Sequence, residues 1–141
     1  MTTLQLCADL AQLGTIRDFV AKASRDLDVD EASIPDLTLA VDEICSNIVR
    51  HGYGGLGGQL KVTVQRVVDG VQVTVRDWGT AFDPGSVVVP DVEAPLEQRS
   101  LGGLGLYLVH QLMDEVHFEF SVEQGNSVTM VKRLQHEGGA G

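Results

Sequence analysis

Hydrophobic and polar residues recur along this chain with two different spacings. A short apolar run over residues 4–7 is compatible with a first strand. From about Asp9 to Leu27 the apolar residues, Leu10 among them, return every three or four positions, which predicts a first helix with Gly14 as a weak point.

A second helix is marked by start and stop signals. Ser33 followed three residues later by Asp36, with Pro35 in the first turn, is typical of a helix N-cap. Apolar residues then follow at helical spacing, and we expect the helix to run to about Arg50 and to stop at Gly52. Both helices carry an apolar stripe that needs a surface to pack against.

The spacing then changes to strict alternation, which predicts strands. The alternating segments are residues 60–65, 71–76, 116–122 and 128–133. Asp69-Gly70 fits a two-residue turn between the first two, and residues 124–126 fit a turn between the last two. The sequence therefore predicts two hairpins.

A long irregular segment and a third helix separate these hairpins. Residues 78–103 hold three of the four prolines and no sustained period, and loops of that length are usually functional. A leucine-rich helix opens at the glycines that follow, and residues 136–141 have too little apolar content to pack.

The order β-α-α-ββ-loop-α-ββ predicts one α+β domain over residues 1–135, a two-layer α/β sandwich. Its sheet should be mixed and mostly antiparallel, with three main helices on one face.

Composition narrows the possible functions. The 141 residues carry 10 Lys and Arg against 20 Asp and Glu, a formal net charge of −10, with no basic cluster. This charge disfavours direct nucleic-acid binding and favours a basic protein partner, although solubility alone also explains it. Cys7 and Cys45 lack metal-ligand spacing, and no apolar run fits a signal peptide or a bilayer span. We therefore expect reduced thiols, no membrane association and a cytoplasmic protein.

The second predicted helix carries a carboxylate and an amide four residues apart. Glu43 and Asn47 leave the same face of the helix, and Arg50 lies one turn further on. A carboxylate can orient or deprotonate a hydroxyl, and an amide oxygen suits a Mg²⁺ ion whose other ligands are phosphates and water. On spacing alone, such a pair is more often part of a solvated helix face.

Asp77 ends a predicted strand and is followed by Trp78-Gly79. Side chains at such positions commonly face a ligand. A carboxylate only accepts hydrogen bonds, so it would select the exocyclic amine of adenine over the carbonyl of guanine. The alternative interpretation is an ordinary turn.

The glycines Gly102, Gly103 and Gly105 open the third helix. They let an anion approach bare backbone N–H groups at the positive end of the helix dipole. No Gly-Lys-Ser/Thr follows and no strand leads straight into them, so neither a Walker loop nor a Rossmann loop is indicated. A flexible hinge is an equally good interpretation of the glycines alone.

Taken in order, these motifs resemble the GHKL ATPases, the superfamily of gyrase, the heat-shock chaperone ATPase and histidine kinases. The narrower similarity is to the anti-sigma-factor serine/threonine kinases, and it spans essentially the whole chain. The matching stretches are residues 40–47 through His51-Gly52-Tyr53, 77–84, 102–108, 113–116 and 126–130. The resemblance implies the histidine-kinase-like (Bergerat) sandwich, with an ATP lid at about residues 80–101.

The resemblance also implies roles for individual residues. Glu43 would act as the general base or orient the hydroxyl that reacts, Asn47 would hold Mg²⁺, and Asp77 would bind the adenine amine. Gly79 would let the base approach, and Thr129 would reach the same ring, directly or through water. The implied nucleotide-binding set is Asn47, Arg50, Asp77, Gly79, Ala81, Phe82, Arg99, Gly102, Gly103, Leu104, Gly105, Leu106 and Thr129.

Four positions keep an alternative or depart from the family pattern. Arg99 would meet the γ-phosphate or the substrate, or face solvent, and His51 is more simply a helix-end histidine. Arg17 matches an exposed basic position that the family uses for partner docking, and is otherwise a surface arginine. Ala81 stands where the wider superfamily has a second glycine, which would stiffen the lid.

Site chemistry and resemblance together point to phosphoryl transfer from Mg-ATP. All four histidines lie within or after the predicted ATPase fold, so we expect the acceptor in another protein. By resemblance the protein is a serine/threonine kinase that phosphorylates a STAS-domain anti-anti-sigma protein, sequesters a sigma factor and forms a homodimer. A non-catalytic, ATP-gated protein-binding module is the alternative.

Overall fold

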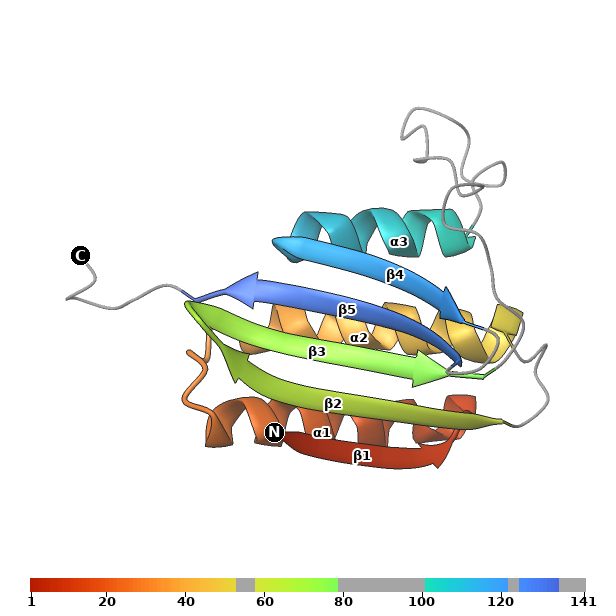
Figure 1. Ribbon diagram of the computed structural model, residues 1–141, viewed down its shortest axis with the longest axis horizontal. Helices are drawn as coiled ribbons and strands as arrows, with labels where there is room; N and C mark the ends of the chain where they lie inside the picture. The colour runs from red at the N-terminus through yellow and green to blue at the C-terminus, as the bar shows by residue number, and fades with distance from the viewer. Residues whose placement is uncertain (53–57, 79–100, 122–124, 135–141) are drawn as a thin grey trace.

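The structure, a computed structural model, describes residues 1–52, 58–78, 101–121 and 125–134, and for residues 51, 52 and 101–106 it describes the backbone alone. The described elements follow the predicted order (Figure 1). They are β1 (Thr2–Cys7), a 3-10 turn (Leu10–Gln12), α1 (Leu13–Asp26), α2 (Ile34–Asn47), a π-helix (Ile48–Gly52), β2 (Gln59–Val67), β3 (Gly70–Asp77), α3 (Leu101–Leu112), β4 (Glu115–Ser121) and β5 (Gly125–Arg133).

The five strands form one sheet in the order β1-β2-β3-β5-β4, and all four pairings are antiparallel. In Figure 1 the three α-helices lie behind this sheet, with α2 between α1 and α3. The predicted α+β sandwich with three helices on one face is confirmed, whereas the sheet formed by the described strands is fully antiparallel and not mixed. None of the helices in the described ranges is both long enough and apolar enough to span a membrane.

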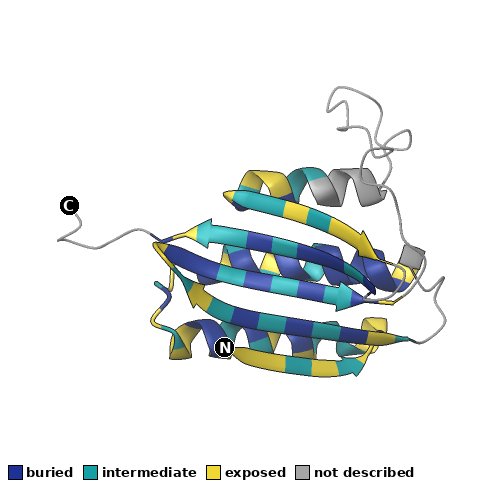
Figure 2. Cartoon of the chain, viewed as in Figure 1, coloured by how far each residue is buried: buried dark blue, intermediate teal, exposed yellow. Residues whose placement is uncertain are grey.

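The core lies between the helices and the sheet because strand residues alternate between two faces. Figure 2 shows this alternation as dark and light bands along β2 and β3. The fully buried residues include Leu60, Val62 and Val64 of β2, Val71, Val73 and Val75 of β3, Val20 of α1 and Leu37 of α2. Burying each such side chain stabilises the fold by about 1.5–3 kcal/mol.

Two helix boundaries differ from the prediction. Leu10, assigned to the first helix, lies in the 3-10 turn and is 46% exposed. Asp9 caps this turn by accepting a hydrogen bond from the N–H of Ala11 at 2.9 Å. At the other boundary, α2 passes into the π-helix at Ile48 instead of continuing as an α-helix. Short π-helical segments are frequent at functional sites.

α2 starts where the sequence predicts it, but the predicted hydrogen bond from the helix to the side chain of the N-cap residue is not formed. Ser33 occupies the N-cap position, yet its hydroxyl donates to the carboxylate of Asp30 at 2.9 Å. The carbonyl oxygen of Ser33 accepts the first helical hydrogen bond, from the N–H of Leu37 at 3.1 Å. The predicted capping by the Ser33 side chain is therefore wrong, because the preceding turn supplies a charged acceptor.

The first hairpin turns one residue earlier than predicted. Val68 and Asp69 form the turn, and Asp69 takes a φ of 60° while Gly70 already pairs with Val67. Glycine is required at residue 70 by packing, because a Cβ there would lie 2.5 Å from the carbonyl oxygen of Lys132. The predicted turn at 124–126 is displaced as well, since residues 125 and 126 belong to β5.

Lys132 joins β5 to two helices. Its Nζ donates to the carbonyl oxygen of Leu112 at 2.9 Å and lies 3.2 Å from Oδ2 of Asp36. The cation thus meets the negative end of α3, and the carboxylate lies in the first turn of α2, where the helix dipole is positive. The Lys132 side chain is only 17% exposed, so this contact is shielded from solvent.

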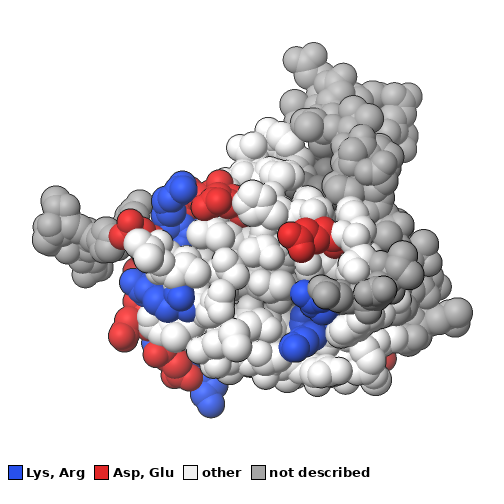
Figure 3. All heavy atoms as spheres, in the orientation of Figure 1, with Lys and Arg blue, Asp and Glu red and all other residues white. Residues whose placement is uncertain are grey.

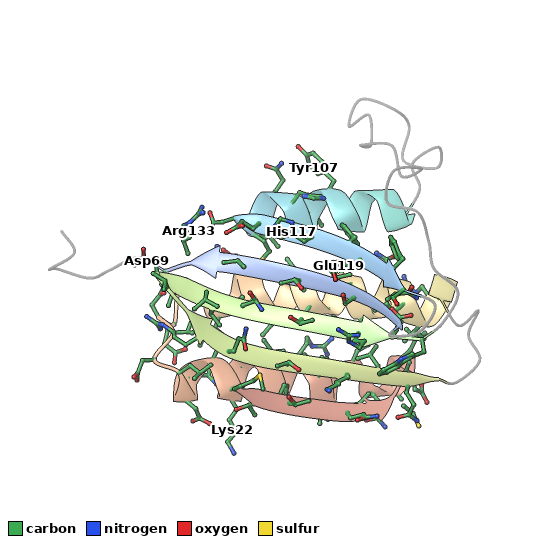
Figure 4. The ribbon with its side chains drawn as sticks, in the orientation of Figure 1. Lys22, Asp69, Tyr107, His117, Glu119 and Arg133 are labelled. Carbon is green, nitrogen blue, oxygen red and sulfur yellow. The ribbon has the colours of Figure 1, made fainter. Side chains whose placement is uncertain are left out.

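We expect Lys132→Met to lower the free energy of unfolding by about 1–3 kcal/mol, because it removes a charged hydrogen bond from a shielded site. Lys22→Met is the matched control, since Lys22 is exposed on α1 (Figure 4). The control should change stability by less than about 0.5 kcal/mol. Urea unfolding followed by circular dichroism measures both, and equal effects would contradict the role of Lys132.

Candidate functional site

Three elements that carry predicted site residues meet at one end of the sandwich. β3 ends at Asp77, α2 ends at Asn47 and α3 begins at Leu101, all toward the right-hand end of Figure 1. The fold therefore gathers chain segments that are far apart in the sequence.

Glu43 and Asn47 of α2 differ in burial. Glu43 is half-buried, and Asn47 is only 6% exposed. The Nδ2 atom of Asn47 is buried and makes no hydrogen bond with any residue in the described part of the chain. Leaving a buried amide unpaired costs about 1–3 kcal/mol, so the solvated-face interpretation does not apply to Asn47.

The environment of Asn47 fits a Mg²⁺ ligand. A half-turn of the amide exchanges its nitrogen and oxygen, so Oδ1 can take the position that Nδ2 holds without a partner. An amide oxygen is a hard, neutral ligand that Mg²⁺ accepts beside phosphate oxygens and water. A bound cation would thus satisfy an atom that the described residues leave unsatisfied.

Asp77 is a buried carboxylate with fixed neighbours. It is 5% exposed, and Asn126, directly opposite on β5, donates from Nδ2 to its Oδ1 at 3.1 Å. The thiol of Cys45 on α2 lies within electrostatic reach. Burial raises the pKa of Cys45, and the negative charges of Asp42 and Asp77 raise it further. Asp77 is therefore a buried carboxylate held by a hydrogen bond from the neighbouring strand, which an ordinary surface turn would not require.

Thr129 does not share the surroundings of Asp77. Thr129 pairs with Thr74, whereas Asp77 pairs with Asn126. Successive strand residues point to opposite faces, so Thr129, three positions after Asn126, lies on the face away from the helices. Thr129 is therefore not the neighbour of Asp77 on β5, and its contact with the adenine ring stays a prediction. The neighbour of Asp77 is Asn126, which the sequence analysis did not single out. Only the register of β5 against β3 identifies it.

Two predicted basic residues lie on the surface. Arg17 is half-exposed, but its Nη1 lies 2.7 Å from Oδ1 of Asp42, the residue before Glu43. Arg50 is exposed in the π-helix that follows α2. Any partner that binds Arg17 through a carboxylate would compete with Asp42 for it.

The remaining predicted positions are described partly or not at all. Gly79, Ala81, Phe82 and Arg99 lie outside the described residues. For the third helix, the backbone places five predicted phosphate-binding residues in the first two turns of α3. The first four N–H groups of a helix lack helical partners, so the earliest of these residues can offer free N–H groups to an anion. These five are Gly102, Gly103, Leu104, Gly105 and Leu106.

Gly125 allows the chain to close around Asp77. Its φ is +86°, a conformation that side chains disfavour. A Cβ at this position would lie 2.5 Å from the carbonyl oxygen of Asp77 and 2.8 Å from two ring atoms of Trp78. The missing side chain therefore lets β5 begin directly beside Asp77.

We expect Gly125→Ala to lower the free energy of unfolding by about 1–3 kcal/mol, because it combines a strained φ with overlap on backbone atoms. Trp78 is the single tryptophan, so its fluorescence spectrum should shift as its ring moves. Gly14→Ala is the matched control, since its Cβ would meet only Arg17 Nη2 at 3.6 Å. The control should be neutral or stabilising by up to about 1 kcal/mol. Similar destabilisation by both variants would contradict the special packing at Gly125.

Comparison with known proteins places this fold and site in a family. The sequence pattern of the histidine kinase-like ATPase domain matches residues 6–132. The serine-protein kinase RsbW of Bacillus cereus (strain AH187) is 34% identical over 108 residues, which cover 74% of this chain and 66% of that protein, slightly under two thirds. RsbW of Bacillus licheniformis (strain ATCC 14580) is 34% identical over 131 residues, covering 89% of this chain and 80% of that protein.

A solved structure supports the same fold. The crystal structure of the RsbU and RsbW domains of a Mycobacterium tuberculosis protein superposes with a TM-score of 0.63 at 19% identity. The superposition covers 95% of this chain and 33% of that one. The chain therefore belongs to the histidine kinase-like ATPase family, and its relatives there are the RsbW serine-protein kinases.

Proposed function

We propose that this protein binds Mg-ATP where α2, β3 and α3 meet and transfers its terminal phosphoryl group to a serine or threonine of another protein. The observation that carries the proposal is the pair of buried polar groups at this end. Asp77 is buried and held by Asn126, and Asn47 is buried with an amide atom that no described residue satisfies. The serine-protein kinase relatives support the same activity.

The binding residues have separate tasks. Asp77 accepts a hydrogen bond from the exocyclic amine of adenine, which contributes about 1.5–3 kcal/mol for a charged acceptor. Asn47 supplies an amide oxygen to Mg²⁺, whose charge neutralises the phosphates when it is bound. The N–H groups in the first turn of α3 favour binding of the phosphate chain.

Glu43 acts on the acceptor. Its carboxylate orients the acceptor hydroxyl and takes its proton as the acceptor oxygen bonds to the γ-phosphorus. The bond between that phosphorus and the β,γ-bridging oxygen breaks, and ADP leaves with the electron pair. Glu43 is half-buried and has no hydrogen bond or ion pair within the described ranges, so its carboxylate is available for this task.

The partners follow from the family and the charge. We propose that the acceptor is a STAS-domain anti-anti-sigma protein, that a sigma factor competes with it, and that the kinase is a cytoplasmic homodimer. A net charge of −10 supports a basic regulator as the sequestered partner. Arg17 remains the proposed docking residue, with Asp42 as the group that a partner must displace.

We expect Glu43→Gln to slow phosphoryl transfer by at least about a hundredfold, because general-base assistance is lost while the shape is kept. Transfer is measured with labelled ATP, Mg²⁺ and purified STAS-domain proteins, and ATP affinity by calorimetry should stay within about twofold. Glu31→Gln, at an exposed ion pair with Arg25, is the control. Equal transfer by wild type and Glu43→Gln would remove Glu43 from the mechanism. ATP-dependent partner capture without transfer by the wild type would favour the non-catalytic module.

We expect Asp77→Asn to weaken ATP binding by about 10- to 100-fold, the equivalent of one charged hydrogen bond. The amide can also donate, so the preference for ATP over GTP should shrink. Calorimetry with each nucleotide measures the ratio, and circular dichroism checks that the variant is folded. An unchanged ATP-to-GTP ratio in a folded variant would show that Asp77 does not read the base.

A further inference from the structure

A row of four residues crosses the helix-facing side of the sheet at the end where the candidate site lies. The register places Leu60 on β2, Asp77 on β3, Asn126 on β5 and Phe120 on β4 in this row. Exposure rises along it, because Leu60 is fully buried, Asp77 is 5% exposed, Asn126 is partly exposed and Phe120 is 42% exposed. Within the described part of the chain, the row is therefore most open on the side of β5 and β4. A ligand that reaches Asp77 from that side passes Asn126.

The amide of Asn126 has one favourable orientation toward Asp77. Its Nδ2 donates to Oδ1 of Asp77 at 3.1 Å. An ionised carboxylate only accepts hydrogen bonds, so turning the amide over would set its oxygen against the carboxylate oxygen. The contact thus fixes which end of the amide is the nitrogen, a choice that the positions of the heavy atoms often leave open.

This orientation places a hydrogen-bond donor next to an acceptor. An amide nitrogen carries two N–H groups, and the bond to Asp77 uses one of them. The second N–H of Asn126 is on the same nitrogen and therefore lies close to the carboxylate oxygens of Asp77. Together the two side chains complement any group that carries a donor and an acceptor on neighbouring atoms.

Adenine carries such a pair of atoms on its Watson–Crick edge. Its exocyclic amine donates, and the ring nitrogen N1 beside it accepts. We propose that Asn126 donates its second N–H to N1 of adenine while Asp77 accepts from the exocyclic amine. This inference rests on the proposed function, since it requires the base of the nucleotide to bind at Asp77. It makes Asn126 a residue that determines the specificity of the site.

The second contact sharpens the choice between bases. Guanine has the opposite groups at both positions, a carbonyl in place of the amine and an N–H in place of the bare N1. Asp77 would then face a carbonyl oxygen, and Asn126 would face another donor. A site that forms hydrogen bonds with two atoms of one base rejects the other base at both, because each buried group is left without a partner.

A purely structural role for Asn126 is the alternative. In that role the amide only holds the carboxylate of Asp77, and the base is recognised through Asp77 alone. The partial exposure of Asn126 favours a direct contact, because a ligand can reach its amide. The two roles differ in one measurable respect. Only direct contact makes the affinity depend on N1 of the base.

ATP analogues that each lack one atom or group test the proposal by calorimetry. Deaza-ATP has a C–H group in place of N1, and purine riboside triphosphate lacks the exocyclic amine. The wild type should bind each at least about fivefold more weakly than ATP, the equivalent of one hydrogen bond. Asn126→Ala should bind ATP and deaza-ATP within about twofold of each other. It should still prefer ATP over purine riboside triphosphate, because Asp77 is intact.

Ser127→Ala is the matched control. Ser127 follows Asn126 on β5, so its side chain lies on the outer face of the sheet, the face that Figure 3 shows. This variant should keep the wild-type preference for ATP over both analogues. Equal binding of ATP and deaza-ATP by the wild type would overturn the proposal. So would an Asn126→Ala variant that keeps the full preference for ATP over deaza-ATP.

Circular dichroism checks that Asn126→Ala is folded. If it is not, NMR spectra of the wild type decide, because the side-chain N–H signals of Asn126 should shift more with ATP than with deaza-ATP. Equal shifts would overturn the proposal. A wild type that binds ATP without sensing N1 contradicts this inference alone and leaves the proposed function standing. A wild type that binds no ATP contradicts the proposed function, and this inference with it.

Discussion

The packing of α2 on the inner face of β3 is the contact on which the candidate site depends. Val41 and Ile44 of α2 belong to the same buried core as the valines of β3. Cys45 is buried there within reach of the charges of Asp42 and Asp77. The same contact brings the end of α2, with Asn47, to the end of the sheet where Asp77 lies. Without it, the amide and the carboxylate would sit on separate elements with no fixed relation.

Buried polar groups at this end are in two different states. Asp77 is satisfied by Asn126, so the folded chain holds its carboxylate in one orientation before any ligand arrives. Asn47 has an amide atom that the described residues leave unsatisfied. A held acceptor favours selectivity for one base, and an unsatisfied amide favours binding of a cation that completes its environment. The two states therefore suit the two proposed tasks, recognition of the base by Asp77 and metal binding by Asn47.

The two faces of the sheet carry different kinds of side chain, because successive side chains of a strand point to opposite faces. The inner face carries valine and leucine into the core and ends in Asp77 and Asn126. The outer face carries threonine and glutamine, with Lys61 and Glu119 on opposite sides. The proposed nucleotide site and the outer surface of the sheet therefore use different side chains of the same strands.

The order and type of the elements were determined by the sequence itself, because helical and alternating periods are local properties that tertiary packing did not overrule here. The motifs around Glu43, Asn47 and Asp77 could also be recognised from the sequence, since each depends on spacing within one element. The tertiary structure alone decided that Asn126 and not Thr129 lies beside Asp77. Likewise only the fold shows that Arg17 pairs with Asp42. Such contacts follow from strand register and from helix packing. A shift of one residue in register exchanges the two faces of a strand, and the local spacing of residues does not encode the register.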